Sequence, residues 1–163
     1  MPSKTVKPST KSQDYANGLA MRKKVLGADY VEATLRDAND LLMPFQELLT
    51  EFAWGKVWTR EGLDLRTRSL LTVAMCIALN RPHEIKLHLR GAVRNGVSNL
   101  EIRELLLHAF IYCGGPACVD AAAVIKACLP EIEAQERGAA AKPKKAIGAG
   151  KRARKKGASP AAV

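Results

Sequence analysis

Apolar residues recur along most of this chain with the three-to-four-residue spacing of amphipathic helices, and the alternation that marks strands is absent. Residues that start and stop helices divide this pattern into segments. We expect helices at about 14–26, 29–38, 40–59, 65–79, 82–95, 99–112 and 117–135. The sequence therefore predicts an all-α fold, with one helical domain of six to seven helices.

Residues that favour helix ends support several of these boundaries. Asp64 suits the N-cap of the helix over 65–79, and Pro82 suits the first turn of the next helix. Ser98 and Glu101 have the spacing of a capping box. The helix over 65–79 is apolar on most of its surface, so we expect it at the centre of the fold.

Positive charge is concentrated at the two ends of the chain. The net charge is +10, yet residues 1–12 and 138–163 together hold eleven lysines and arginines and no acid. The remaining body is therefore close to neutral. Because both ends are poor in large apolar residues, we predict a disordered basic segment over 1–13 and a disordered Lys/Ala-rich basic tail over 138–163, flanking a domain over 14–137.

The distribution of apolar residues also bears on location. The first residues lack the apolar stretch of a signal peptide, and no apolar run is long enough to span a bilayer. We therefore expect a cytoplasmic protein with no membrane contact. In that setting the four cysteines are expected to be buried thiols.

The helix over 82–95 carries the residues most suited to chemistry. Arg81, Glu84 and His88 are spaced i, i+3, i+7, so a base, an acid and an imidazole share one face, and His83 and Arg90 lie on the same segment. The alternative interpretation is a solvated face with an ordinary Glu84–His88 pair. His83 and His88 are five residues apart and point to different sides of a helix, so we predict no metal site.

A second polar stripe lies on the helix over 40–59. Glu51, Trp54 and Trp58 also follow i, i+3, i+7 spacing. An acid beside an indole in apolar surroundings has a raised carboxyl pKa, which suits a proton donor. Alternatively, the two tryptophans pack an interface and Glu51 lies at its rim.

Several segments, in this order and spacing, resemble the carboxymuconolactone decarboxylase family. They are EFAWGKVW at 51–58, GLDLRTRSL at 62–70, ALNRPHE at 78–84, HLRGA at 88–92, NGV at 95–97, EIRE at 101–104, YCG at 112–114 and Ala121. The resemblance covers about residues 15–130. Related AhpD-like peroxidases carry a C-x-x-C at the positions of Arg81 and Glu84, so this chain departs from thiol chemistry there.

The resemblance implies an AhpD-like domain that forms a homo-oligomer, commonly a trimer or a hexamer. It also implies cofactor-independent decarboxylation of 4-carboxymuconolactone to the β-ketoadipate enol-lactone, a step of protocatechuate catabolism. The substrate is a dicarboxylate lactone whose own carbonyl accepts the electrons left by carbon dioxide, so no cofactor is expected.

Roles for individual residues follow from that reaction as hypotheses. His88, held by Glu84, is the first choice for proton donor or oxyanion partner, and Glu51 is the second. Trp54 would provide a dry environment for the leaving carboxylate. The residues expected to grip the carboxylates are Arg81 and Arg90, assisted by Arg66 or His83.

Three alternatives remain open. The chain could act on another lactone or a β-keto acid, or it could be a thiol-dependent peroxidase that uses Cys113 and Cys118, which are close enough in sequence for a disulfide. A non-enzymatic alternative is a helical polyanion-binding protein, because the basic run at 151–156 resembles tails that make phosphate contacts.

Overall fold

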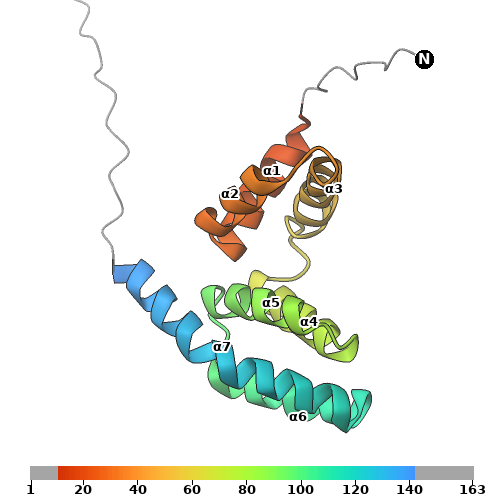
Figure 1. Cartoon of the computed structure of the whole chain (residues 1–163), viewed down its shortest axis with the longest axis vertical. Coiled ribbons are helices and arrows are strands. Elements are labelled where there is room, and N and C mark those ends of the chain that lie inside the picture. The colour runs from red at the N-terminus through yellow and green to blue at the C-terminus, as the bar shows by residue number, and fades with distance from the viewer. Residues whose placement is uncertain (1–10, 142–163) are drawn as a thin grey trace, which may run out of the picture.

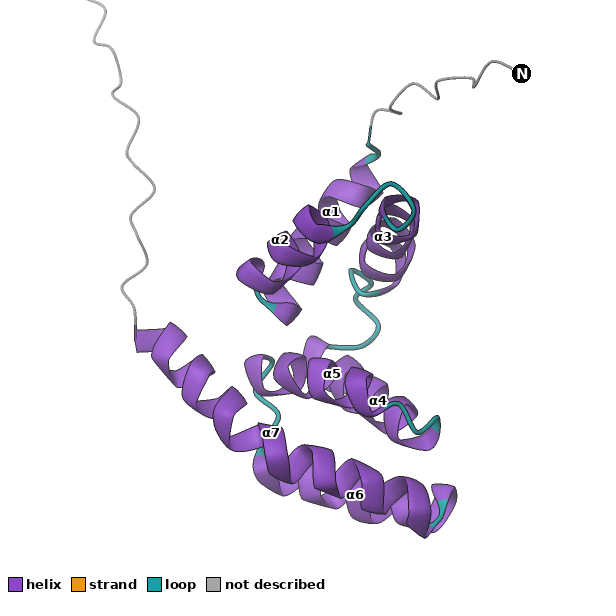
Figure 2. Cartoon of the chain, viewed as in Figure 1, coloured by secondary structure: helices purple, strands orange, loops and turns teal. Residues whose placement is uncertain are grey.

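The computed structural model describes residues 11–141, which form seven α-helices and one π-helical segment, with no strand in that range (Figure 2). The elements are α1 (Gln13–Leu26), α2 (Ala28–Asp37), α3 (Met43–Leu49), η1 (Thr50–Val57), α4 (Leu65–Ala78), α5 (Pro82–Arg94), α6 (Asn99–Cys113) and α7 (Gly115–Ala141). The predicted all-α fold is confirmed. Most of the two predicted basic ends, at 1–10 and 142–163, lies outside the described residues.

The predicted helix ends are confirmed where a capping side chain is involved. Asp64 accepts a hydrogen bond from the Thr67 backbone N–H at 2.7 Å, which starts α4. Ser98 and Glu101 form both halves of a capping box at the start of α6. These contacts are local in sequence, which is why spacing alone could locate them.

The helices form two groups, each around its own apolar core (Figure 1). The larger group comprises α4 to α7, and its fully buried side chains include Ile77, Ile85 and Leu89. As predicted, α4 is central, because it packs against α5, α6 and α7. The smaller group comprises α1, α2, α3 and η1, around Val25 and Trp54.

The segment predicted as one helix over 40–59 differs from that prediction. It is helical from Met43 to Val57, but η1 has wider π-helical turns, with the Trp58 N–H bonded to the Ala53 carbonyl oxygen at 3.0 Å. Here the backbone of η1 lies directly against α1. A Cβ atom at Gly55 would overlap the carbonyl oxygen of Asp14 and lie 2.9 Å from its carbonyl carbon.

A buried arginine reinforces this contact between α1 and the α3–η1 segment. Arg22 is buried and donates hydrogen bonds to the Thr50 hydroxyl at 3.0 Å and to the Gln46 side-chain oxygen at 2.8 Å. Burial lowers the pKa of Arg22. The smaller group is therefore stabilised by its apolar core, by close packing of the α1 and η1 backbones, and by the hydrogen bonds of Arg22.

The last helix is longer than the sequence indicated. α7 continues to Ala141, whereas the prediction ended it near 135 and placed a disordered tail from 138. The reason is that the segment is rich in Ala, Glu, Gln and Arg, all strong helix formers that extend a helix already anchored by packing. Pro130 lies inside α7, and the helix changes direction along its length (Figure 1).

Within residues 11–141, no helix combines the length and the apolar character that a membrane crossing requires.

Candidate active site

Helix α5 belongs to the larger group of helices and also packs against α1 of the smaller group. Ile85 and Leu89 are buried in the larger core, against α4 and α7. On another side, Gly91 faces α1, where a Cβ atom would come within 3.0 Å of a Val25 methyl group. Side chains on α5 therefore lie at the junction of the two cores, where their surroundings are partly shielded from water.

The stripe formed by Arg81, Glu84 and His88 occupies one side of α5. Arg81 is the N-cap residue, Glu84 is exposed in the first turn, and His88 is half-buried one turn later. Burial lowers the pKa of His88, and the negative charge of Glu84 partly opposes this shift. Among the described residues no hydrogen bond joins Glu84 to His88, so the carboxylate acts through its charge. At neutral pH the imidazole is mainly uncharged and can donate one hydrogen bond.

The structure separates His83 and Arg90 from that stripe. Both line a cavity of about 240 Å³ between α2 and α5, together with Tyr30, Lys86 and Leu87. Arg90 donates a hydrogen bond to the Gln135 side-chain oxygen of α7 at 2.8 Å. We expected these two residues to bind the substrate carboxylates beside the catalytic His88, but they lie on a different side of the helix from it.

Two of the polar residues in this cavity were missed from the sequence. Lys86 follows the same i, i+3, i+7 spacing as His83 and Arg90, so helical periodicity alone could have identified it. Tyr30 comes from α2, which is distant in sequence, and no local pattern indicated that it would lie beside α5.

Arg66 is also not brought to His88. A hydrogen bond joins the C-terminal end of α5 to the first turns of α4: the Asn95 side-chain amide donates to the Ser69 hydroxyl at 2.9 Å. The two helices therefore run antiparallel, and Arg66 lies beside the end of α5, away from Arg81. It forms an ion pair with Glu101 of α6 instead.

Trp54 and Glu51 both lie on η1, in different surroundings. Trp54 is only 4% exposed and stacks on Trp58, with 4.7 Å between ring centroids, in a core that also contacts Leu87 of α5. Glu51 is half-buried and makes no hydrogen bond or ion pair with the described residues. Because η1 has π-helical turns, the i, i+3 spacing no longer places Glu51 directly over Trp54. A role for either residue in catalysis stays a prediction.

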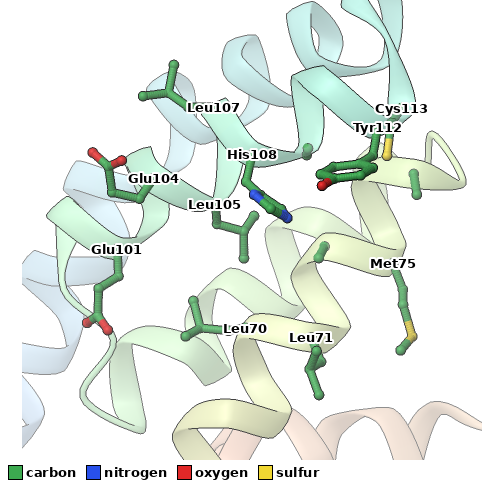
Figure 3. Close-up of a pocket in the computed structure, with 13 residues that line it drawn as sticks. Leu70, Leu71, Met75, Glu101, Glu104, Leu105, Leu107, His108, Tyr112 and Cys113 are labelled. Atoms are coloured by element: carbon green, nitrogen blue, oxygen red, sulfur yellow. The ribbon is translucent and has the colours of Figure 1, made fainter.

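A larger cavity of about 830 Å³ lies elsewhere, between α4 and α6 (Figure 3). His108 projects from α6 toward α4, and its ring lies 4.8 Å from that of Tyr112. The other polar lining residues include Glu101 and Glu104, and no lysine or arginine lines the cavity. An apolar, acidic cavity suits a dicarboxylate poorly. No local pattern in the sequence indicated this cavity, because its leucines have the spacing of core residues.

The cysteines do not form a reactive pair. All four are free thiols, and Cys76, Cys118 and Cys128 are buried. Burial raises the pKa of each of these three thiols, and for Cys118 the neighbouring Cys113 adds to the effect. A thiol nucleophile needs the opposite shift. The burial of Cys118 and the raised pKa of its thiol therefore oppose the thiol-dependent peroxidase alternative.

Comparison with known proteins supplies the family. The sequence model of the carboxymuconolactone decarboxylase family matches residues 44–127, which include η1, α4, α5 and α6. The nitrosuccinic acid decarboxylase of Metarhizium robertsii is 48% identical over 118 residues, which is 72% of this chain and 82% of that protein. The 4-carboxymuconolactone decarboxylase of Acinetobacter baylyi is 46% identical over 105 residues, 64% of this chain and 78% of that protein. The chain therefore belongs to the carboxymuconolactone decarboxylase family.

Proposed function

We propose that this protein is a carboxy-lyase that converts 4-carboxymuconolactone to the β-ketoadipate enol-lactone in the catabolism of protocatechuate, without a cofactor. The observation that carries the proposal is the 46% identity to a 4-carboxymuconolactone decarboxylase, in a chain whose family match includes the whole of α5 with His88. A cytoplasmic location and the aromatic-catabolic setting belong to this proposal.

The chemistry explains why a small helical protein can catalyse such a reaction. The bond from the ring carbon to its carboxylate breaks, and the electron pair moves through the ring double bond to the lactone carbonyl oxygen. Carbon dioxide leaves, and a proton is then added to the carbon beside that carbonyl group. The protein needs to orient the substrate, stabilise the oxyanion and supply one proton.

The stripe on α5 contains groups for each of these tasks. His88 donates a hydrogen bond to the developing oxyanion, or delivers the proton. Glu84 stabilises any positive charge that forms on the imidazole ring of His88. Arg81 binds a substrate carboxylate, since it is exposed and no acidic side chain in the described part of the chain pairs with it. Glu51 stays the second candidate donor, and Trp54 contributes apolar surroundings at a distance rather than a contact.

A second substrate is favoured by a specific observation. The relative named as a nitrosuccinic acid decarboxylase matches more of this chain, at 48% identity. In nitrosuccinic acid the leaving carboxylate sits on the carbon that bears the nitro group, so the nitro oxygens accept the electron pair. Both compounds are dicarboxylates that carry their own electron acceptor. The same oxyanion partner and proton donor would therefore serve either reaction.

The proposal includes a homo-oligomer, supported by two apolar surfaces that are exposed in the single chain. One surface lies along the α4–α6 cavity and includes Met75, Leu107 and Ile111. The other lies on the opposite group of helices, on and just before α3 and η1, and includes Leu41 and Phe45. Two different apolar surfaces on one chain suit head-to-tail contacts between copies, which close into a ring.

A side-by-side assay tests the reaction. Purified protein treated with a chelator is mixed with freshly prepared 4-carboxymuconolactone or with nitrosuccinate, and carbon dioxide release and ultraviolet absorbance are followed. Turnover of the lactone supports the proposal, and turnover of nitrosuccinate alone would assign the second reaction. His88→Ala should lower kcat by about a hundredfold or more with either substrate. Full activity in that variant would exclude His88 as the donor.

A further inference from the structure

The cavity between α2 and α5 has a lining drawn mainly from one helix. Four of its five lining residues follow one stripe of α5, at i, i+3, i+4 and i+7, and Tyr30 of α2 closes it from the other side. Its volume of about 240 Å³ lies below the roughly 300–1,000 Å³ typical of pockets for drug-sized ligands. The space therefore suits a molecule of a few carbon atoms.

The charges in this cavity are not balanced by the protein. His83, Lys86 and Arg90 are basic, and none of the lining residues is acidic. Within residues 11–141, neither Lys86 nor Arg90 forms an ion pair with a carboxylate, and the hydrogen bond from Arg90 goes to the neutral amide of Gln135. One turn further along α5, by contrast, Arg94 pairs with Glu136 at 2.7 Å. An anion in the cavity would supply the missing negative charge.

The chemistry of the lining residues selects a carboxylate. A guanidinium binds a carboxylate through two parallel hydrogen bonds, and a lysine adds a point charge. Leu87 provides an apolar surface for the carbon atoms of the ligand. We propose that the α2–α5 cavity binds a small organic carboxylate, at a site separate from the stripe that carries His88.

The separation follows from the helix itself. Arg81, Glu84 and His88 do not line the cavity, and the residues that do line it lie around the other side of α5. His88 of the same chain is not among the residues that a molecule in the cavity would contact. The inference therefore goes beyond the decarboxylation reaction and does not depend on which substrate is decarboxylated.

A built-in reporter makes the site measurable. Leu87 lines the cavity and also packs against the core that contains the stacked Trp54 and Trp58. We therefore expect succinate, titrated into the full-length protein at pH 7, to change tryptophan fluorescence in a saturable manner. Calorimetry at the same pH provides an independent measure of the dissociation constant.

Variants of one exposed lysine test the assignment. Lys86→Gln should weaken succinate binding about tenfold or more, the loss expected for one charge-assisted hydrogen bond. Lys86→Arg should keep most of the affinity. Lys126→Gln, a change of the same kind at an exposed position of α7, should not alter it, and His88→Ala should keep the site because it lies on the other side of α5.

Three results would overturn the proposal. The first is wild-type affinity in both Lys86→Gln and Arg90→Gln, with folding of each checked by circular dichroism. The second is loss of succinate binding in His88→Ala, which would place the ligand at the catalytic stripe. The third is equally tight binding of inorganic phosphate, which lacks carbon atoms to contact Leu87 and would indicate a general anion site.

Discussion

Replacing Gly55 with alanine tests the unusual contact between α1 and η1. The added methyl group would overlap the Asp14 carbonyl oxygen and lie 2.9 Å from the Asp14 carbonyl carbon. Carbon atoms normally pack at about 3.5 Å or more, so the helices must separate by at least about 0.5 Å. Both partners are backbone, and neither can move aside by rotating a side chain.

The size of the effect follows from two opposing contributions. Overpacking of a tight core costs about 1–3 kcal/mol, and backbone atoms on both sides favour the upper end. Alanine is a better helix former than glycine by about 1 kcal/mol, which offsets part of this cost. We expect the free energy of unfolding to fall by about 2 kcal/mol. For a domain of this size that lowers Tm by roughly 6–10 °C.

The measurement is thermal and urea unfolding at one fixed protein concentration, because association of subunits makes Tm depend on concentration. Gly62→Ala is the matched control, since a Cβ atom there meets nothing within 4 Å. Tryptophan fluorescence of the folded Gly55→Ala protein should also change, because Trp54 is the neighbouring residue. Equal unfolding midpoints for the two variants would refute the proposed backbone contact.

Three further predictions concern pH, assembly and the basic tail. Burial lowers the pKa of His88 from its ordinary 6.5, so the native state binds fewer protons than the unfolded state. The stability present above pH 6.5, where His88 is neutral, is therefore lost as the pH falls through its native pKa. Between pH 7.5 and 5.0, the free energy of unfolding measured in urea should fall less for His88→Gln than for the wild type. Leu107 is 57% exposed, and Leu107→Glu should convert the oligomer to smaller species in light scattering, whereas a wild-type mass would exclude that surface as a subunit contact. Removing residues 142–163 should abolish salt-sensitive retention on DNA and preserve decarboxylation; retention without the tail would place polyanion binding on the helical body.

The parts of the fold that could be predicted depend on neighbours in sequence. Asp64 caps α4, and Ser98 with Glu101 starts α6, through contacts that span three residues. The close backbone contact between α1 and η1 joins residues more than thirty positions apart, such as Gly18 and Gly55. In the sequence, a glycine at either position indicates only a weaker helix former. The sequence therefore indicated that a helix was present there but not its geometry.

In the candidate site, too, arrangements within one helix could be predicted from the sequence, whereas contacts between helices could not. Helical periodicity predicts that Glu84 and His88 share one side of α5, since this needs only the geometry of the helix, with Arg81 at its N-cap. It could not indicate that His83 and Arg90 would meet Tyr30 of another helix. Tertiary structure also decides which basic side chains form an ion pair. Among the described residues Arg94 pairs with Glu136, whereas Lys86 and Arg90 pair with no carboxylate.

The position of α5 between the two cores also matters while the chain is being synthesised. The helices α1 to η1 leave the ribosome first, yet part of their apolar surface is covered only when Gly91 of α5 packs against Val25 and Leu26. Until α5 has been synthesised, that apolar surface of α1 remains exposed and can associate with other nascent chains. A weakened contact at Gly55 would therefore lower the yield of soluble protein in cells, even for molecules that remain folded once complete.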